Sequence, residues 1–162
     1  MSERTVSFLA FAAALGSGLI AGVFFTFSSF VMAALARLPP GQGGAAKQNI
    51  NITVINPLFM GVFMGTAALC AALVAAAFMN VDGARNWPLL AGCAFYLIGS
   101  IGVTMAANVP LNNALAALDA GSAGAEPVWQ TYLAGWTMWN HLRGAASLAA
   151  CAAFIVALRA SA

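Results

Sequence analysis

The sequence predicts an all-α integral membrane protein: a four-helix bundle with short interfacial helices in its first and third connections. Hydrophobic residues make up 62% of the 162 residues and charged residues only 6%, against about 25% charged residues in ordinary soluble domains. Three gaps between charged residues are 32, 34 and 33 residues long. Each gap exceeds the roughly 20 apolar residues that cross a bilayer, so each predicts a membrane span.

The expected helices lie in one domain, residues 1–162, and cover about 6–36, 56–79, 87–107 and 128–158. The first is too long for a signal peptide, whose apolar stretch has about 7–15 residues, and the run Leu38-Pro39-Pro40-Gly41 ends it. Asp82-Gly83 turns the second helix into the third, and Asn108-Val109-Pro110 ends the third. The first and third connections each contain a helical stretch, at 45–52 and 112–118.

The fourth span is predicted differently, because the last gap between charges holds only 15 residues. Its helix must therefore begin earlier, near Pro127 or Val128, and include His141 and Arg143. Lys and Arg residues slightly favour cytoplasmic termini under the positive-inside rule. We expect a multi-pass protein of the bacterial inner membrane in that orientation.

The charges and cysteines exclude several classes of function. The formal net charge of +2 is spread singly along the chain, and no basic run could neutralise a row of phosphates, so nucleic-acid binding is not expected. Cys70, Cys93 and Cys151 are odd in number, far apart and set in apolar runs. This pattern predicts unpaired packing thiols and no metal site.

Small residues recur at intervals of four on the first two helices, at Ala14, Gly18 and Gly22 and at Gly61 and Gly65. Such stripes let helices approach closely in lipid, where hydrophobicity does not drive helices together. Packing within the bundle is the simpler interpretation. A homo-oligomer through Gly18 and Gly22, or through Gly61 and Gly65, is the alternative.

Polar residues that could carry chemistry gather at one membrane face, at the start of the fourth helix above all. Helical spacing places Trp136, Asn140 and Arg143 on one face and stacks Trp139 one turn above Arg143. Ionisable groups at membrane depth mark sites by default, and His141, the single histidine, belongs to a residue type that exchanges protons near neutral pH. An aromatic belt with a snorkelling arginine and a packing histidine is the alternative.

Four segments resemble the anthrone oxygenase-like family, over nearly the whole chain. They are Gly22-Val23-Phe24-Phe25-Thr26-Phe27-Ser28-Ser29-Phe30-Val31-Met32, Asn56-Pro57-Leu58-Phe59-Met60, Asn108-Val109-Pro110-Leu111-Asn112, and the stretch from Trp136 to Arg143. The resemblance implies four transmembrane helices and, for fungal members, oxidation of an anthrone to an anthraquinone by O₂ without a recognised metal or flavin. The positions that match are Asn108, Asn112, Trp136, Asn140, His141 and Arg143.

On this resemblance we expect a cofactor-independent oxygenase whose partners are O₂, a small lipophilic molecule and the bilayer. His141 would remove a proton and Arg143 would stabilise the enolate oxygen. Asn108, Asn112 and Asn140 would bind the substrate, and Trp136 or Trp139 would stack on its ring. The alternative is a non-catalytic membrane protein that binds a lipophilic ligand or acts as a structural bundle. A transporter is disfavoured, because no acidic residue lies within a span.

Overall fold

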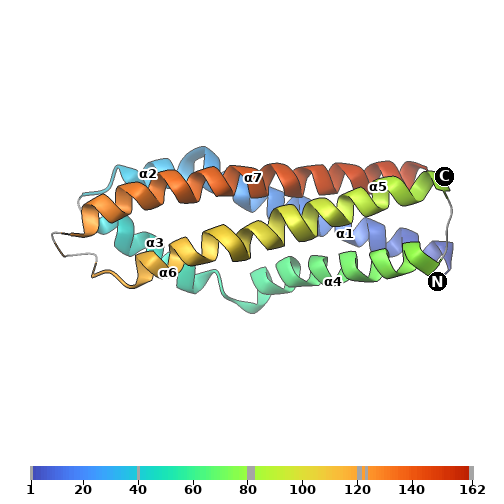
Figure 1. Ribbon diagram of the computed structural model, residues 1–162, viewed down its shortest axis with the longest axis horizontal. Helices are drawn as coiled ribbons and strands as arrows, with labels where there is room; N and C mark the ends of the chain where they lie inside the picture. The colour runs from blue at the N-terminus through green and yellow to red at the C-terminus, as the bar shows by residue number, and fades with distance from the viewer. Residues whose placement is uncertain (1, 40, 80–82, 120–121, 123, 161–162) are drawn as a thin grey trace.

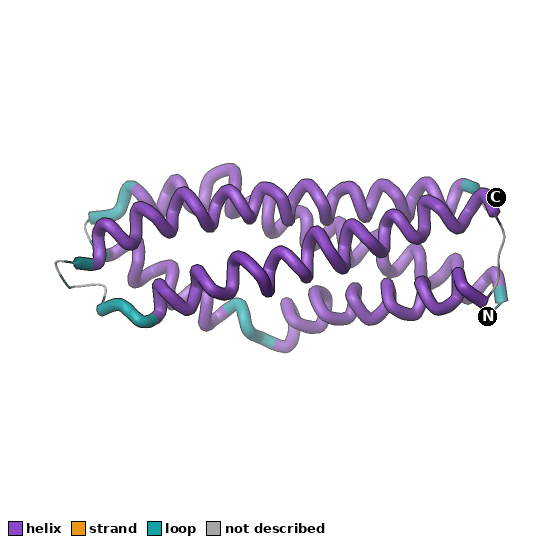
Figure 2. Tube along the Cα trace, in the orientation of Figure 1, coloured by secondary structure: helices purple, strands orange, loops and turns teal. Residues whose placement is uncertain are grey.

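The computed structural model describes residues 2–39, 41–79, 83–119, 122 and 124–160, and all regular secondary structure in these ranges is helical. Four long helical stretches run along one axis, with both ends of the chain at one end of the bundle (Figures 1 and 2). Each stretch is long and apolar enough to cross a membrane: Glu3–Leu35, Pro57–Met79, Asn86–Ala116 and Ala125–Arg159. The prediction of an all-α bundle with four membrane-length helices is therefore confirmed.

The first stretch consists of α1 (Glu3–Thr26), the π-helical segment η1 (Phe27–Val31) and α2 (Met32–Ala36). It begins at Ser2, whose side chain accepts a hydrogen bond from the Thr5 backbone N–H at 3.2 Å, an ordinary N-cap. After the turn, Gly41 adopts a φ of 79°, in the left-handed region that glycine enters without strain. Pro40 lies outside the described residues.

Helix α3 (Gln42–Thr53) confirms the helix predicted in the first connection and folds back against the bundle. Gly43 faces Trp129 so closely that an added Cβ would lie 3.0 Å from the indole ring. The Gln48 side chain donates to the Leu115 and Leu118 carbonyls, at 2.7 and 3.0 Å. One face of α3 is therefore buried, although its sequence is mostly polar or small.

The second stretch is α4 (Pro57–Met79), capped by the Asn56 side chain, which accepts from the Phe59 N–H at 3.0 Å. The third joins α5 (Gly83–Ala94), η2 (Phe95–Gly102), η3 (Thr104–Asn108) and α6 (Val109–Ala116). The predicted helix end at Asn108-Val109-Pro110 is therefore wrong. Pro110 lies in the first turn of α6, directly after π-helical turns, where its missing N–H costs little. The predicted turn residue Asp82 lies outside the described residues.

Helix α7 (Ala125–Arg159) spans the whole bundle and packs against α1, α5 and η2. Two apolar clusters fill the interior. The larger lies towards the termini and includes Phe24, Phe63, Tyr96 and Phe154. The smaller joins α2, α3, α6 and the start of α7, and its buried members are Met32, Leu35, Leu115, Trp129, Tyr132 and Trp136.

The predicted small-residue stripes form close helix contacts only in part. Ala14 is buried, and a Cβ added at Gly18 would lie 3.4 Å from the Cys151 Sγ. A Cβ added at Gly22, Gly61 or Gly65 would have no neighbour within 4 Å. Other glycines make closer approaches, among them Gly16, where an added Cβ would collide with the Thr66 hydroxyl, and Gly99, where it would collide with the Ala146 Cβ. The interpretation as packing within the chain is thus wrong for Gly22, Gly61 and Gly65. A four-residue spacing places small residues on one face of a helix, but it does not determine whether that face is turned towards a neighbouring helix. A homo-oligomer through these glycines stays a prediction.

The three cysteines are free, as predicted. Cys70 and Cys93 are buried and their thiols hydrogen-bond each other across α4 and α5, while Cys151 is half-buried. These thiols pack the half of the bundle that lies towards the chain termini.

Candidate functional site: a buried cationic cavity

A cavity of about 250 Å³ lies between η1, α3, the start of α4, η3 and α7, in the half of the bundle remote from the chain termini. Its walls are mostly aromatic, aliphatic and methionine side chains, and its polar lining is limited to two cations, two amides and a hydroxyl. The polar residues are Lys47, Asn51, Thr104, Asn112 and Arg143. An apolar pocket with a few convergent polar groups is the usual form of a small-molecule site.

Lys47 is the first cation, and it enters the cavity from α3 with only 1% of its surface exposed. Its Nζ lies 4.1 Å from the centroid of the Trp136 ring, and the rings of Phe27 and Tyr132 are 5.7 and 5.5 Å away. The ammonium donates to Asn51 Oδ1, one turn later on the same helix. Burial, and secondarily the charge of Arg143, lowers the pKa of Lys47 to about 7.

Arg143 is the second cation, and α7 supplies it with 5% of its surface exposed. Nη2 donates to Asn140 Oδ1 at 2.6 Å and Nη1 donates to the Thr104 hydroxyl at 3.1 Å. Its guanidinium carbon lies 4.2 Å from the Phe24 ring centroid and 5.2 Å from that of Trp136. Both cations therefore share the Trp136 ring, one approaching it from α3 and the other from its own helix.

Asn140 fixes Arg143 by joining α7 to the first helical stretch. Its Nδ2 donates to the Phe24 carbonyl at 2.7 Å and to the Ser28 hydroxyl at 2.8 Å. The Phe24 carbonyl precedes the π-helical segment η1, where the regular hydrogen-bond ladder changes register. The irregular turn and the buried amide thus hold the guanidinium in place.

Among the residues that the structure describes, no acid offsets the positive charge of the cavity. Within the described ranges, its lining includes no carboxylate, and the hydrogen bonds of both cations go to neutral oxygens. The Arg143 Nε and Trp136 Nε1 are buried donors without a partner in the part of the chain that the structure describes. Unpaired buried charge is costly, and an anionic oxygen in the cavity would relieve that cost.

The other predicted substrate-binding residues surround this cavity to different degrees. Asn112 lines it and accepts a hydrogen bond from the Tyr132 hydroxyl at 2.8 Å. Asn108 is 1% exposed and donates to the Trp136 carbonyl at 3.3 Å, but it stands behind the lining. Trp139 is half-buried and is not part of the lining.

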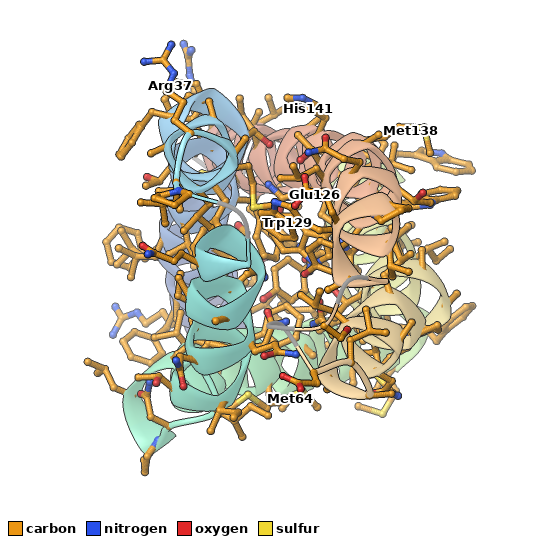
Figure 3. All side chains as sticks on the ribbon, turned by 90° about the vertical axis from the view of Figure 1, so that its left-hand side faces the viewer. Arg37, Met64, Glu126, Trp129, Met138 and His141 are labelled. Carbon is orange, nitrogen blue, oxygen red and sulfur yellow. The ribbon has the colours of Figure 1, made fainter. Side chains whose placement is uncertain are left out.

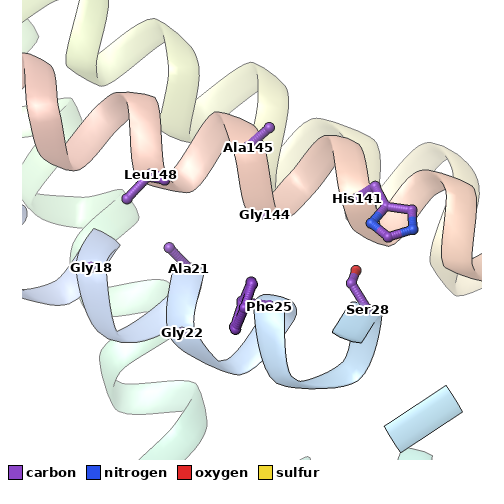
Figure 4. Close-up of a pocket in the computed structure, with 9 residues that line it drawn as sticks. All are labelled: Gly18, Ala21, Gly22, Phe25, Ser28, His141, Gly144, Ala145 and Leu148. Atoms are coloured by element: carbon purple, nitrogen blue, oxygen red, sulfur yellow. The ribbon is translucent and has the colours of Figure 1, made fainter. Parts of the chain in front are cut away.

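His141 is placed apart from this group. It is exposed and lines a separate groove between α7 and the α1–η1 stretch, where it faces Ser28, while Gly18 and Gly22 line the groove farther along α1 (Figure 4). Seen along the bundle, His141 lies on its outer side while Trp129 points inward (Figure 3). The structure therefore unites Arg143, Asn140, Trp136 and Asn112, and it separates His141 from them.

Lys47 is the main residue that sequence reasoning missed, together with Thr104 and the phenylalanines of the walls. The available signal was that Lys47 is the only lysine in the chain and stands one helical turn before Asn51. In the described part of the chain, no group of three His, Cys, Asp or Glu side chains could hold a metal.

Comparison with known families supplies the context for this geometry. The profile described as anthrone oxygenase matches residues 59–153, which is more than half of the chain. The chain belongs to the anthrone oxygenase family. No curated protein and no solved structure gives a match.

The family match covers α4 to most of α7, and therefore includes Thr104, Asn112, Trp136, Asn140 and Arg143. Lys47 and the phenylalanines of α1 and η1 come from outside the matched segment. The cavity is thus built jointly by the segment that defines the family and by the residues before it.

Proposed function

We propose that this protein is an O₂-dependent oxygenase of a compact, planar, lipophilic ketone of the anthrone type, acting without a cofactor. The observation that carries the proposal is the pairing of two buried cations, without a carboxylate, in a cavity walled by aromatic rings. An anthrone becomes an anion when it loses a methylene proton, and the charge gathers on its ketone oxygen. Arg143 would stabilise that oxygen, since preorganised donors in a dry site act strongly on developing charge.

The shape and lining of the cavity suit such a substrate. Its volume of about 250 Å³ is slightly below the roughly 300–1,000 Å³ of typical small-molecule sites, so a compact ring system is favoured. Phe59 and Phe63 stack with ring centroids 5.7 Å apart, and Phe27 faces Trp136 at 5.7 Å. The lining also includes Met64 and Met105, which are largely exposed on the outer, apolar surface. A lipophilic substrate would enter between them from the bilayer.

The proposed reaction balances with O₂ as the only oxidant. A base removes one methylene proton, and the enolate passes one electron to O₂. The carbon radical and superoxide then form a C–O bond, and a proton converts the adduct to a hydroperoxide. Loss of the second C–H proton breaks the O–O bond and releases hydroxide, which leaves as water. The methylene carbon becomes a carbonyl in a four-electron oxidation, one oxygen atom is in the product and the other is in water.

The predicted site residues keep their proposed roles with different support. Asn112 and Trp136 line the cavity and would contact the substrate, Asn140 would position Arg143, and Asn108 would hold the α7 backbone behind Trp136. Trp139 lies outside the lining. His141 as the base remains a prediction, and its exposed position gives that role little support.

The location in the membrane is a separate proposal. In a bacterial inner membrane with cytoplasmic termini, the cavity would lie in the half of the bundle nearer the opposite face. A cysteine added beside Ala160 should then react with a thiol reagent from the cytoplasmic side only. Labelling from the other side would show that the termini lie on the side opposite the cytoplasm.

The test of the function is O₂ uptake by the purified full-length protein with 1,8-dihydroxyanthrone, after subtraction of the uncatalysed rate. We expect one O₂ consumed for each quinone formed. Arg143→Lys should lose most of this rate, because lysine keeps the charge but not the planar fork of donors. Arg37→Lys is the matched control, since Arg37 is exposed and projects away from the bundle (Figure 3).

A second candidate is a non-catalytic bundle that binds a lipophilic anion. It is favoured by the hydrogen bonds of Asn140 and Arg143, which tie α7 to α1, η1 and η3 and would suit a purely structural clasp. If the ketone quenches tryptophan fluorescence but no O₂ is consumed above the uncatalysed rate, this second function replaces the first.

A further inference from the structure

We propose that Lys47 is the catalytic base that takes the methylene proton from the substrate, an inference that rests on the proposed function. Lys47 is an amine aimed into the cavity from a helix outside the four spans, and it shares the Trp136 ring with Arg143. The residue that would hold the enolate oxygen and the residue that would create the enolate thus reach the same aromatic wall.

The surroundings of Lys47 let it exist both with and without its proton. Burial opposes the ammonium form, as does the positive charge of Arg143. The Asn51 oxygen and the three aromatic rings favour that form. The titratable groups that face it are Tyr132 and Arg143, both from α7, while the lining from α4 and α6 is apolar or amide. A base that operates near neutral pH needs this balance.

The geometry also gives the neutral amine a free lone pair. A neutral lysine has two N–H groups and one lone pair, and one N–H suffices for the bond to Asn51 Oδ1. The lone pair can then accept the methylene proton. The transfer forms an N–H bond and breaks a C–H bond, and it places an ammonium next to the new enolate, so the charges it creates offset each other. The ammonium can return this proton to the peroxide anion, which makes the hydroperoxide. The neutral amine can then take the second C–H proton and pass it to the leaving hydroxide, which departs as water.

A first experiment tests Lys47 without any substrate. Because Lys47 is the only lysine, full-length protein labelled with ¹³C at lysine Cε gives a single side-chain resonance. We expect that resonance to titrate near pH 7, far below the usual lysine pKa of about 10.4. In Asn51→Asp the midpoint should rise, because a carboxylate favours the ammonium. Titration of the wild type near pH 10 would overturn the proposal, whatever the protein does with a ketone.

A second experiment uses turnover of 1,8-dihydroxyanthrone. The wild-type kcat/KM should rise with pH to a plateau, with a midpoint near the NMR value, because only the neutral amine accepts a proton. Lys47→Arg keeps a cation over the rings but cannot serve as a base near neutral pH. It should lose about 10²–10⁴-fold of the rate, whereas the exposed Arg37→Gln should lose none.

The outcomes separate the two claims. If Lys47→Arg turns over at the wild-type rate, Lys47 is not the base. The same conclusion follows if the pH midpoint of kcat/KM is unchanged in Asn51→Asp. In either case the proposed oxygenase function stands. No wild-type turnover would remove the oxygenase, and the proposal for Lys47 with it. If Lys47→Arg fails to fold, the shift of the Asn51→Asp midpoint decides the matter, and an unchanged midpoint would count against Lys47.

Discussion

The hollows on the two sides of α7 differ in charge, burial and shape, although neighbouring residues of one helical turn line both. On the inner side, Arg143, held by Asn140, lines the cavity together with Lys47 and the aromatic walls. On the outer side, His141 and Gly144 line a groove of glycine, alanine and a few larger apolar residues, and it exposes the histidine. A cation within the membrane is stable only where other helices supply oxygen acceptors and aromatic rings. Among the described residues, α7 has such partners on its inner face.

The largest expected effect is that of replacing Arg143, the cation on the inner side of α7. Arg143→Ala leaves Asn140 Oδ1 without its donor, and a buried group left unpaired costs roughly 1–3 kcal/mol. We expect a lower Tm in detergent for Arg143→Ala. Arg143→Lys should melt closer to the wild type yet lose on the order of 10²–10³-fold in turnover, the usual cost of losing a preorganised donor.

The control for this prediction is His141→Ala on the outer face of the same turn. If His141→Ala lowers the Tm as much as Arg143→Ala, the contrast between the two faces is wrong.

A second prediction compares two glycines of α1. Gly16→Ala should destabilise the protein by about 1–3 kcal/mol through overpacking, because the new Cβ would collide with the Thr66 hydroxyl. Gly22→Ala should change the Tm little, because its Cβ would have no neighbour within 4 Å. Thermal melting of the two variants side by side checks this. If Gly22→Ala instead dissociates a dimer in detergent, the homo-oligomer predicted from the sequence gains its first support.

Much of the fold was predictable, because the bilayer imposes a length on every apolar segment. The gaps between charged residues located three of the four stretches, and the last gap, too short for a span, required an earlier start for the fourth. Together they placed Asn108 and Trp136 at the same end of the bundle. The end of the third helix was not predictable from Pro110. A proline in the first α-helical turn after a π-helical segment continues a helix that the usual rule would break, and only the backbone path shows this.

The site was predictable in part, for a comparable reason. Spacing of three and four residues placed Trp136, Asn140 and Arg143 on one face, and all three are buried together. Lys47 was missed because α3 is polar in sequence and its burial comes entirely from contacts with distant segments. Tertiary contacts of that kind leave no periodic pattern in the residues themselves.

The third prediction concerns the pH dependence of stability. The lowered pKa of Lys47, about 7, means that the unfolded chain binds more protons than the folded one between pH 7 and about 10.4, the ordinary value for lysine. The free energy of unfolding should therefore rise with pH across this window, by at most about 1.4 kcal/mol for each unit. Below pH 7 the full cost of the buried ammonium is present. Lys47→Met should abolish the rise, measured as Tm against pH beside the wild type.

The smallest expected effect is that of His141→Gln, which decides whether the outer groove takes part in the reaction. Glutamine keeps similar size and hydrogen-bonding capacity but cannot exchange a proton near neutral pH. Because His141 is exposed and lines a different hollow from Arg143, we expect a Tm close to that of the wild type and turnover of 1,8-dihydroxyanthrone reduced less than about twofold. Such a result removes His141 from the chemistry and leaves Lys47 as the remaining base. A loss of about 10²-fold or more in a well-folded His141→Gln protein, the scale expected for a general base, would restore the base predicted from the sequence. It would also require the substrate to reach the groove beside Ser28. The effect of Ala145→Leu on turnover would then show whether the substrate binds on that side of α7, because Ala145 lines the groove and is not part of the cavity lining.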